Sequence, residues 1–285
     1  MRLPDWIKTR GLSCQHNTKQ ILKKFKVNTV CENARCPNIG MCYSKPTATF
    51  MILGAKCTRN CSFCSVESSF PEPIDSDEPI RVALAAKEMG LKYIIITSVT
   101  RDDLLDGGSQ HFANTVTAVK SIINNAKVEV LTPDFKGDIS AIDTVMNSKP
   151  DVFGHNVETI PRLYPIVRPR ADYNRSLNVL RYAKEISTDT NIKSGIMLGL
   201  GETFKEIIEV LKELKEVGCD FITIGQYLRP TKTNLPVVEY INPNIFEEIR
   251  IIAIEMGFKY VASAPLVRSS MNAEEMCMLG NKQNA

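Results

Sequence analysis

The stretch TFMILGAKCTRNCSFC, residues 49–64, places a short apolar run directly before three cysteines. The run at 49–53 is typical of a buried strand. Cys57, Cys61 and Cys64 follow it in what we expect to be a loop at the C-terminal end of that strand. In parallel α/β barrels the residues that carry chemistry gather at this end of the strands. The stretch therefore predicts both the first strand of a sheet and the position of a reactive site.

The rest of the chain repeats this alternation of short apolar runs with helical patterns. Further strands are predicted at 92–98, 127–132, 151–156, 192–199, 221–225 and 260–264. Thr203 with Glu206, and Asn244 with Glu247, predict two helix capping boxes. Strands that are apolar throughout are buried on both faces, which indicates a parallel sheet covered by helices. An open doubly wound sheet is the alternative, but no GxGxxG opens the first helix.

We therefore predict an α/β fold: a partial parallel (β/α)6-type TIM-like barrel with terminal extensions. The barrel would span residues 49–264. An N-terminal extension, residues 1–48, would carry Cys31, Cys36 and Cys42, and a C-terminal extension, residues 265–285, would complete the chain. A monomer is the expected state.

Composition and charge exclude several classes of protein. No apolar run approaches the ~20 residues that a membrane helix needs, so we expect no membrane association. The N-terminus has no apolar signal region, which predicts a cytoplasmic protein whose cysteines serve metal or redox chemistry rather than disulfides. The formal net charge is +3, yet residues 1–30 alone carry +6. This basic segment is either a solvated arm or a docking surface for an acidic partner, and no nucleic-acid motif accompanies it.

Six cysteines form two triplets, Cys31-x4-Cys36-x5-Cys42 and Cys57-x3-Cys61-x2-Cys64. Zinc would need a fourth protein ligand at either triplet. Soft thiolates at unequal spacing suit an iron–sulfur cluster, which three cysteines would hold with one iron left open. Unrelated thiols are the remaining reading. We expect Cys14, Cys219 and Cys277 to be plain thiols, and His16, His111 and His155 to be structural.

The second triplet, placed after a first barrel strand, resembles the radical S-adenosylmethionine (SAM) superfamily. The resemblance implies a [4Fe–4S] cluster on Cys57, Cys61 and Cys64 whose open iron binds SAM. An electron from the cluster would cleave SAM to a 5′-deoxyadenosyl radical that abstracts hydrogen from unactivated carbon. The cofactor would supply this chemistry, and the barrel would position and shield it.

A narrower resemblance, to the lipoyl synthase family, covers nearly the whole chain in order. It rests on PDWIK (4–8), CENARCPNIGMC (31–42), TSVTRDDLLDGGSQHF (97–112), FGHNVET (153–159), VRPRADY (167–173), KSGIMLGLGET (193–203) and VRSS (267–270). The family is a sulfurtransferase that inserts two sulfurs, at C6 and C8, into an octanoyl chain on a carrier-domain lysine. The resemblance implies a second, auxiliary [4Fe–4S] cluster that is consumed as the sulfur source. Its ligands would be Cys31, Cys36, Cys42 and Ser270, with Arg268 beside it.

The same resemblance places further residues near SAM. Asn156, Glu158 and Arg170 match positions that contact it, and Gly199 and Gly201 would bring backbone close to it. Each of these could instead brace a loop. The chain departs from the family pattern at two points. Met271 follows the RSS motif where tyrosine is usual, and Ser62 replaces the proline of the usual C-P-F-C. The consequence of Met271 is left open.

The implied partners are octanoylated lipoyl carrier domains, either of 2-oxoacid dehydrogenase E2 subunits or of the glycine-cleavage H protein. An electron donor such as ferredoxin or flavodoxin and an iron–sulfur carrier would also be needed, and no nucleic acid. Three alternative functions are a methylthiotransferase acting on tRNA or a ribosomal protein, a two-cluster electron carrier, and a zinc-binding interaction module. The first would be expected to carry an RNA-binding domain, and the second would not need a barrel.

Overall fold

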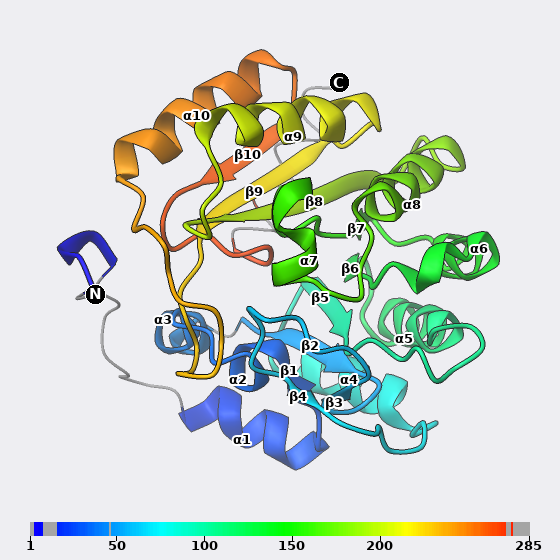
Figure 1. Ribbon diagram of the computed structural model, residues 1–285. Coiled ribbons are helices and arrows are strands. Elements are labelled where there is room, and N and C mark those ends of the chain that lie inside the picture. The colour runs from blue at the N-terminus through cyan, green and yellow to red at the C-terminus, as the bar shows by residue number, and fades with distance from the viewer. Residues whose placement is uncertain (1–2, 8–15, 46, 272–274, 276–285) are drawn as a thin grey trace. The chain divides into compact units, whose positions relative to one another are not determined.

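A computed structural model describes residues 3–7, 16–45, 47–271 and 275 of the chain (Figure 1). The chain divides into two compact units. The N-terminal unit comprises Thr9–Asn60 and Cys64–Phe153, and the C-terminal unit comprises Met1–Lys8, Cys61–Phe63 and Gly154–Ala285. The division of the chain into a barrel and two terminal extensions, 1–48 and 265–285, stays a prediction.

The N-terminal unit is built on a mostly parallel sheet. Its strands lie in the order β1 (Asn28–Thr29), β2 (Thr49–Ile52), β5 (Tyr93–Ser98), β6 (Lys127–Leu131) and β7 (Val152–Gly154), the last ending at the boundary of the unit. Strands β2, β5 and β6 pair in parallel, with Thr49 opposite Ile95. Strand β1 pairs antiparallel with β2, an addition from residues 1–48 that the periodicity did not predict. A separate pair, β3 (Lys56–Cys57) and β4 (Glu67–Ser68), flanks the second cysteine triplet.

Helices cover this sheet. They are α1 (His16–Phe25), α2 (Val30–Asn33), α3 (Ile39–Ser44), α4 (Glu78–Glu88), α5 (Ser109–Ile122), the 3-10 helix η2 (Phe135–Gly137) and α6 (Ile139–Asn147). Helix α5 packs between α4 and α6, and α1 packs on α4. Ile94, Ile96, Phe112 and Val128 are completely buried between helices and strands. This core fixes the C-terminal ends of β2, β5 and β6, from which the polar loops project.

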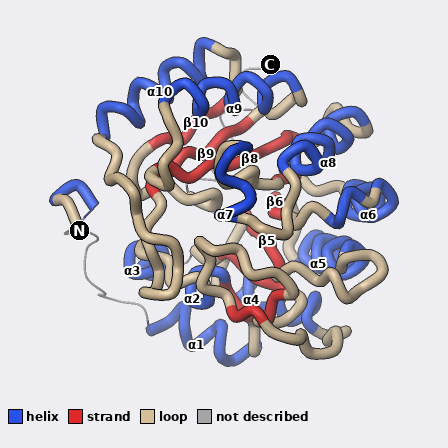
Figure 2. Tube along the Cα trace, viewed as in Figure 1, coloured by secondary structure: helices blue, strands red, loops and turns tan. Residues whose placement is uncertain are grey.

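The C-terminal unit repeats the pattern with three parallel strands, β8 (Asn191–Leu198), β9 (Phe221–Gln226) and β10 (Tyr260–Ser263). Phe221 lies opposite both Lys193 and Tyr260 in the register. The other elements of the unit are η1 (Asp5–Ile7), η3 (Pro161–Leu163), α7 (Tyr164–Val167), α8 (Tyr173–Glu185), α9 (Phe204–Glu216) and α10 (Pro243–Glu255). Figure 2 shows α9 and α10 running alongside β9 and β10, and α10 packs on β10.

The predicted strands are all present, with small shifts at their ends. The capping box at the start of α9 is confirmed: Thr203 Oγ1 accepts from the Glu206 N–H at 3.4 Å, and Glu206 accepts from the Thr203 N–H at 2.8 Å. The second predicted capping box is wrong. Helix α10 begins two residues earlier, because Pro243 fits the first helical turn and Asn242 caps it by accepting from the Asn244 N–H. In the described part of the chain, no helix has the length and apolarity needed to span a membrane.

Candidate functional site

The first cysteine triplet lies on two short helices of the N-terminal unit and on the segment between them. Cys31 lies in α2, which Thr29 caps by accepting from the Glu32 N–H at 3.3 Å, and Cys42 lies in α3. The Cys36 N–H donates to the Cys31 carbonyl at 3.0 Å. Cys31 is buried, whereas the other two thiols are half-buried. Two of the thiols thus lie on successive short helices, and Cys36 lies in the segment between them.

The thiols of this triplet influence one another electrostatically. Burial raises the pKa of the Cys31 thiol to about 12, a backbone hydrogen bond with Thr49 opposes this, and the neighbouring Cys36 and Cys42 raise it further. Burial, and then Cys36, also raise the pKa of Cys42. Such mutual effects require short separations. The structure thus brings Cys31, Cys36 and Cys42 close to one another, and burial favours the protonated thiol at Cys31 and Cys42.

The second triplet is held by backbone donors. Cys57 Sγ, at the end of β3, accepts from the N–H of Arg59 at 3.4 Å and from the N–H of Thr100 at 3.3 Å. Cys64 Sγ accepts from the Val66 N–H at 3.4 Å. Cys61 belongs to the C-terminal unit, so the joining of all three in one site stays a prediction.

The donor set fits iron–sulfur clusters better than single ions. Among the described residues, no three His, Cys, Asp or Glu side chains are grouped closely enough to hold one metal ion. A four-iron cluster makes a different demand, since each cysteine binds its own iron. None of the six cysteines forms a disulfide, and N–H groups directed at sulfur are a recurrent feature of cluster sites.

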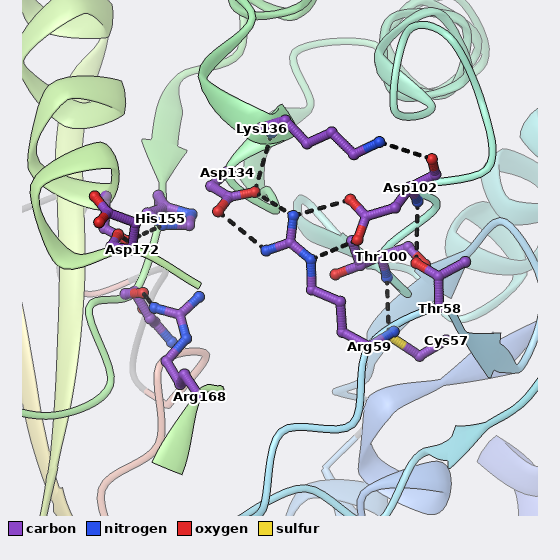
Figure 3. A network of polar contacts seen from close by, with 12 residues as sticks. Cys57, Thr58, Arg59, Thr100, Asp102, Asp134, Lys136, His155, Arg168 and Asp172 are labelled. Atoms are coloured by element: carbon purple, nitrogen blue, oxygen red, sulfur yellow. Dashed lines mark hydrogen bonds and ion pairs between the residues drawn. The ribbon is translucent and has the colours of Figure 1, made fainter. Parts of the chain in front are cut away.

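An ion-pair cluster of Arg59, Asp102 and Asp134 lies beside Cys57, at the start of the loop of the second triplet (Figure 3). The guanidinium of Arg59 forms two bidentate pairs, with Asp102 at 2.7 and 2.9 Å and with Asp134 at 2.7 and 3.0 Å. Burial alone would lower the pKa of Arg59, but these hydrogen bonds keep it above its ordinary value. Neither Asp102 nor Asp103 caps α5, whose N-cap is Gly108. Asp106 instead accepts from the Gly108 N–H in the turn before that helix.

A second polar group lies in the C-terminal unit, around Asn156. Its Nδ2 donates to Ser269 Oγ at 2.7 Å and to Glu158 Oε1 at 3.1 Å. Its buried Oδ1 has no hydrogen-bond partner in the described part of the chain. Burial raises the pKa of Glu158, while Arg168 and Asn156 oppose the shift. The structure thus brings Asn156 and Glu158 together with the C-terminal VRSS segment.

Comparison with known proteins settles the family. The profile of the Radical SAM superfamily matches residues 51–214. The chain is 54% identical over 275 residues to the lipoyl synthase of Caldicellulosiruptor saccharolyticus, covering 95% of this chain and 96% of that one. It is 51% identical over 260 residues to the lipoyl synthase of Aquifex aeolicus, covering 91% and 94%. The chain belongs to the lipoyl synthase family.

Solved structures with lower identity show the same fold. Streptococcus suis SuiB bound to S-adenosylmethionine aligns with a TM-score of 0.59 at 14% identity, over 81% of this chain and 54% of that one. Methylornithine synthase (PylB) aligns with a TM-score of 0.57 at 14% identity, over 88% and 82%. These alignments and the parallel strands confirm the predicted α/β fold of partial-barrel type. As a lipoyl synthase family member the chain is an enzyme, and the superfamily implies SAM and a [4Fe–4S] cluster.

The residues predicted to contact SAM differ in burial and in their hydrogen-bond partners. Arg170 is exposed, whereas Arg168 is buried and donates through Nη1 to the Asn156 carbonyl at 2.9 Å. Gly199 lies at φ +100°, where an added Cβ would meet Gln226 Nε2 at 2.1 Å. Its N–H donates to Glu202, which also accepts from the Leu200 N–H at 3.0 Å. Close backbone packing therefore accounts for Gly199, and its contact with SAM stays a prediction, as it does for Gly201 and Arg170.

The C-terminal segment that carries Ser270 is folded back within its own unit. Arg268 Nη1 donates to the Val267 carbonyl at 2.6 Å, and the Met271 N–H closes a turn on the Arg268 carbonyl at 2.8 Å. Ser270 itself is half-buried. It belongs to the C-terminal unit and the first triplet to the N-terminal unit, so its role as a ligand stays a prediction.

The departure at Ser62 from the lipoyl synthase pattern has a structural counterpart. The Ser62 N–H donates to the Val167 carbonyl at 3.0 Å, a bond that proline could not make. Its carbonyl accepts from the Leu235 N–H at 3.1 Å and from Asn234 Nδ2 at 3.2 Å. The serine thus adds a tether next to Cys61.

Sequence reasoning missed four residues of these polar groups: Arg59, Asp134, Arg168 and Ser269. Arg59 lies between two predicted ligands and Ser269 lies next to one, so both positions carried a signal that Asp134 lacked. The histidines and the thiol that we expected to be structural agree with the structure where it describes them. His111 pairs with Glu78 at 2.8 Å, His155 with Ser176 at 3.1 Å, and Cys219 is fully buried. Cys14, Cys277 and the side chain of His16 lie outside the described residues.

Proposed function

We propose that this enzyme inserts two sulfur atoms, at C6 and C8, into a protein-bound octanoyl-lysine to give the lipoyl group. Membership of the lipoyl synthase family makes lipoate biosynthesis by radical SAM chemistry the general activity. The observation that carries the finer proposal is the pair of cysteine triplets. One triplet alone would serve SAM cleavage, and the second needs a separate purpose.

Cys57, Cys61 and Cys64 would hold the SAM-binding [4Fe–4S] cluster, which supplies the electron that cleaves SAM. The N–H groups of Arg59 and Thr100 then stabilise the negative charge on Cys57 Sγ. Asn156 is the best supported of the proposed SAM contacts, because its buried Oδ1 is an unfilled acceptor among the described residues. Glu158, Arg170, Gly199 and Gly201 complete the proposed set.

Cys31, Cys36 and Cys42, with Ser270, would hold the auxiliary [4Fe–4S] cluster as a sulfur-donating substrate. Thiolates, not thiols, bind iron, so loading this triplet must release protons that burial holds on Cys31 and Cys42. Arg268 would add positive charge beside Ser270. An iron–sulfur carrier would rebuild the cluster after each turnover. The described cysteines form no disulfides, which is consistent with a reducing cytoplasm, where the proposal places the reaction.

The proposed acceptor is a carrier domain, either an E2 lipoyl domain or the H protein, and an electron donor such as ferredoxin or flavodoxin would feed the clusters. The basic segment at the N-terminus supports a docking surface on α1. Lys19, Lys23, Lys24 and Lys26 are all exposed there, although Lys24 also pairs with Glu88. Arg2, Lys8 and Arg10 lie outside the described residues.

Charge neutralisation tests this surface. Changing Lys19, Lys23, Lys24 and Lys26 to Gln should weaken carrier binding at low salt, and added salt should narrow the difference from the unchanged enzyme. A matched variant carries the same change at four exposed lysines elsewhere, Lys149, Lys205, Lys212 and Lys232. Equal binding by the two variants at low salt would remove the docking surface from the proposal.

The function itself is tested on protein purified without oxygen. Iron and sulfide are counted, and then SAM, a reductant and an octanoylated carrier are added. We expect about eight irons per chain, as two four-iron clusters require, formation of 5′-deoxyadenosine, and a carrier mass that shows two added sulfurs. Zinc in place of iron would indicate an interaction module. Iron without 5′-deoxyadenosine would indicate an electron carrier.

A further inference from the structure

Arg59 is placed unusually for a residue between two cluster cysteines, because its side chain points away from the loop and into the protein. The side chain is 5% exposed and reaches Asp134, which is completely buried after β6, and Asp102, which follows β5. Four hydrogen bonds of 2.7–3.0 Å join the three groups. The loop of the second triplet is thereby fixed to the C-terminal ends of two strands (Figure 3).

The Arg59–Asp102–Asp134 cluster is called the clamp below. A second set of hydrogen bonds connects this clamp to the sulfur of Cys57. Thr58 Oγ1 donates to the Thr100 carbonyl at 2.9 Å and accepts from the Asp102 N–H at 3.0 Å. The Thr58 N–H also donates to the Thr100 carbonyl, at 3.0 Å. These contacts hold residue Thr100, whose N–H donates to Cys57 Sγ together with the N–H of Arg59.

Stability alone does not account for the clamp. Taking a guanidinium and two carboxylates out of water costs several kcal/mol per ion, and apolar residues of similar volume often stabilise a fold as well or better. The charges are also balanced locally, since Lys136 Nζ donates to the Asp102 carbonyl and the Lys136 N–H donates to Asp134. A balanced, doubly bidentate arrangement fixes orientation more strictly than packing would.

We propose that Arg59 is a positioning residue that directs two N–H groups onto Cys57 Sγ and so raises the reduction potential of the cluster at the second triplet. Hydrogen bonds to a ligand sulfur stabilise the more negative, reduced cluster. The clamp also keeps Cys57 in place when iron binds. The inference rests on the proposed assignment of that cluster to Cys57, Cys61 and Cys64, and it goes beyond it by naming what sets its potential.

The test uses full-length enzyme in which Cys31, Cys36 and Cys42 are changed to Ala, so that only the second triplet can hold a cluster. In this parent, Arg59→Lys keeps the positive charge and loses both bidentate pairs. We expect a more negative midpoint potential by EPR-monitored titration, and iron loss to a chelator about tenfold faster, as for the loss of outer partners at metal sites. Arg250→Lys is the matched control, because Arg250 forms a similar bidentate pair with Glu247 in an exposed position.

Thr58→Val serves as a second variant, since it leaves all charges in place. It removes the two hydrogen bonds of Thr58 Oγ1, with the Thr100 carbonyl and the Asp102 N–H, and keeps the bond from the Thr58 N–H to Thr100. It should shift the potential in the same direction by less, even if Arg59→Lys fails to fold. If the parent binds its cluster and the folded variants match its midpoint potential and its rate of iron loss, the inference is overturned and the proposed function is not. A parent that binds no cluster would overturn the proposed function and the inference with it.

Discussion

The two cysteine segments of the N-terminal unit hold their sulfurs by opposite means. Cys31 and Cys42 lie on short helices, where burial keeps their thiols protonated. Cys57 lies at a strand end, where two N–H groups and a buried ion-pair cluster support its sulfur. Metal binding at the first segment must displace protons that burial holds on Cys31 and Cys42, whereas at the second segment two N–H groups already point at Cys57 Sγ. The difference matches the proposal that one cluster is consumed and the other retained.

Single cysteine changes in the two segments should separate their roles most sharply. Cys57→Ala should abolish 5′-deoxyadenosine formation, because SAM cleavage needs the cluster of the second triplet. Cys31→Ala should leave SAM cleavage in place and abolish sulfur insertion. Both products are measured by liquid chromatography with mass spectrometry. Normal 5′-deoxyadenosine from Cys57→Ala would contradict the assignment of the two segments.

Ser270→Cys tests whether the consumed cluster depends on a weak ligand. A hard oxygen suits iron–sulfur less well than a thiolate, so a fourth sulfur should make the auxiliary cluster harder to dismantle. We expect sulfur insertion to slow by roughly tenfold, the lower end of the effect of altered partners at a metal. The yield of 5′-deoxyadenosine per SAM is the internal control. Sulfur insertion at the normal rate would remove the weak-ligand idea.

Alkylation of the metal-free protein tests whether burial keeps the Cys31 thiol protonated. With its pKa raised to about 12, Cys31 should be only about one-thousandth ionised at pH 9, where an ordinary thiol is about half ionised. Its reaction with iodoacetamide should therefore stay slow and rise about tenfold per pH unit up to about pH 10. Peptide mapping by mass spectrometry measures the rate at this site. A rate that levels off near pH 9 would show that burial does not control Cys31.

Ser62→Pro should give the smallest effect. Proline restores the usual family residue but removes the N–H that donates to Val167. The lost bond costs about 1 kcal/mol, and the stiffer unfolded chain offsets roughly half of that. Urea unfolding should show a net loss below about 1 kcal/mol, with Ser62→Ala, which keeps the N–H, near zero. A larger loss in the alanine variant would mean that the hydroxyl, not the N–H, is the tether.

Local patterns in the sequence predicted much of the fold. Apolar runs such as 92–98 and 221–225 are strands because their residues favour the extended backbone and must be buried. The start of α10 shows the limit of this reasoning. Asn242 and Asn244 are both acceptable caps, and only the position of Pro243 in the first turn decided between them. Helices α2 and α3 went unpredicted because runs of four and six residues are too short for a periodic signal.

The sequence by itself determined the strand–helix alternation, the two cysteine triplets and the family, because each is written in residues close together along the chain or in a full-length match. Tertiary structure decided which polar groups meet. Arg59 pairs with Asp134 across 75 residues, and Asn156 with Ser269 across 113. No local pattern encodes such pairs, because they depend on where strand ends and loops come to lie once the core has packed. These pairings were therefore visible only in the folded chain.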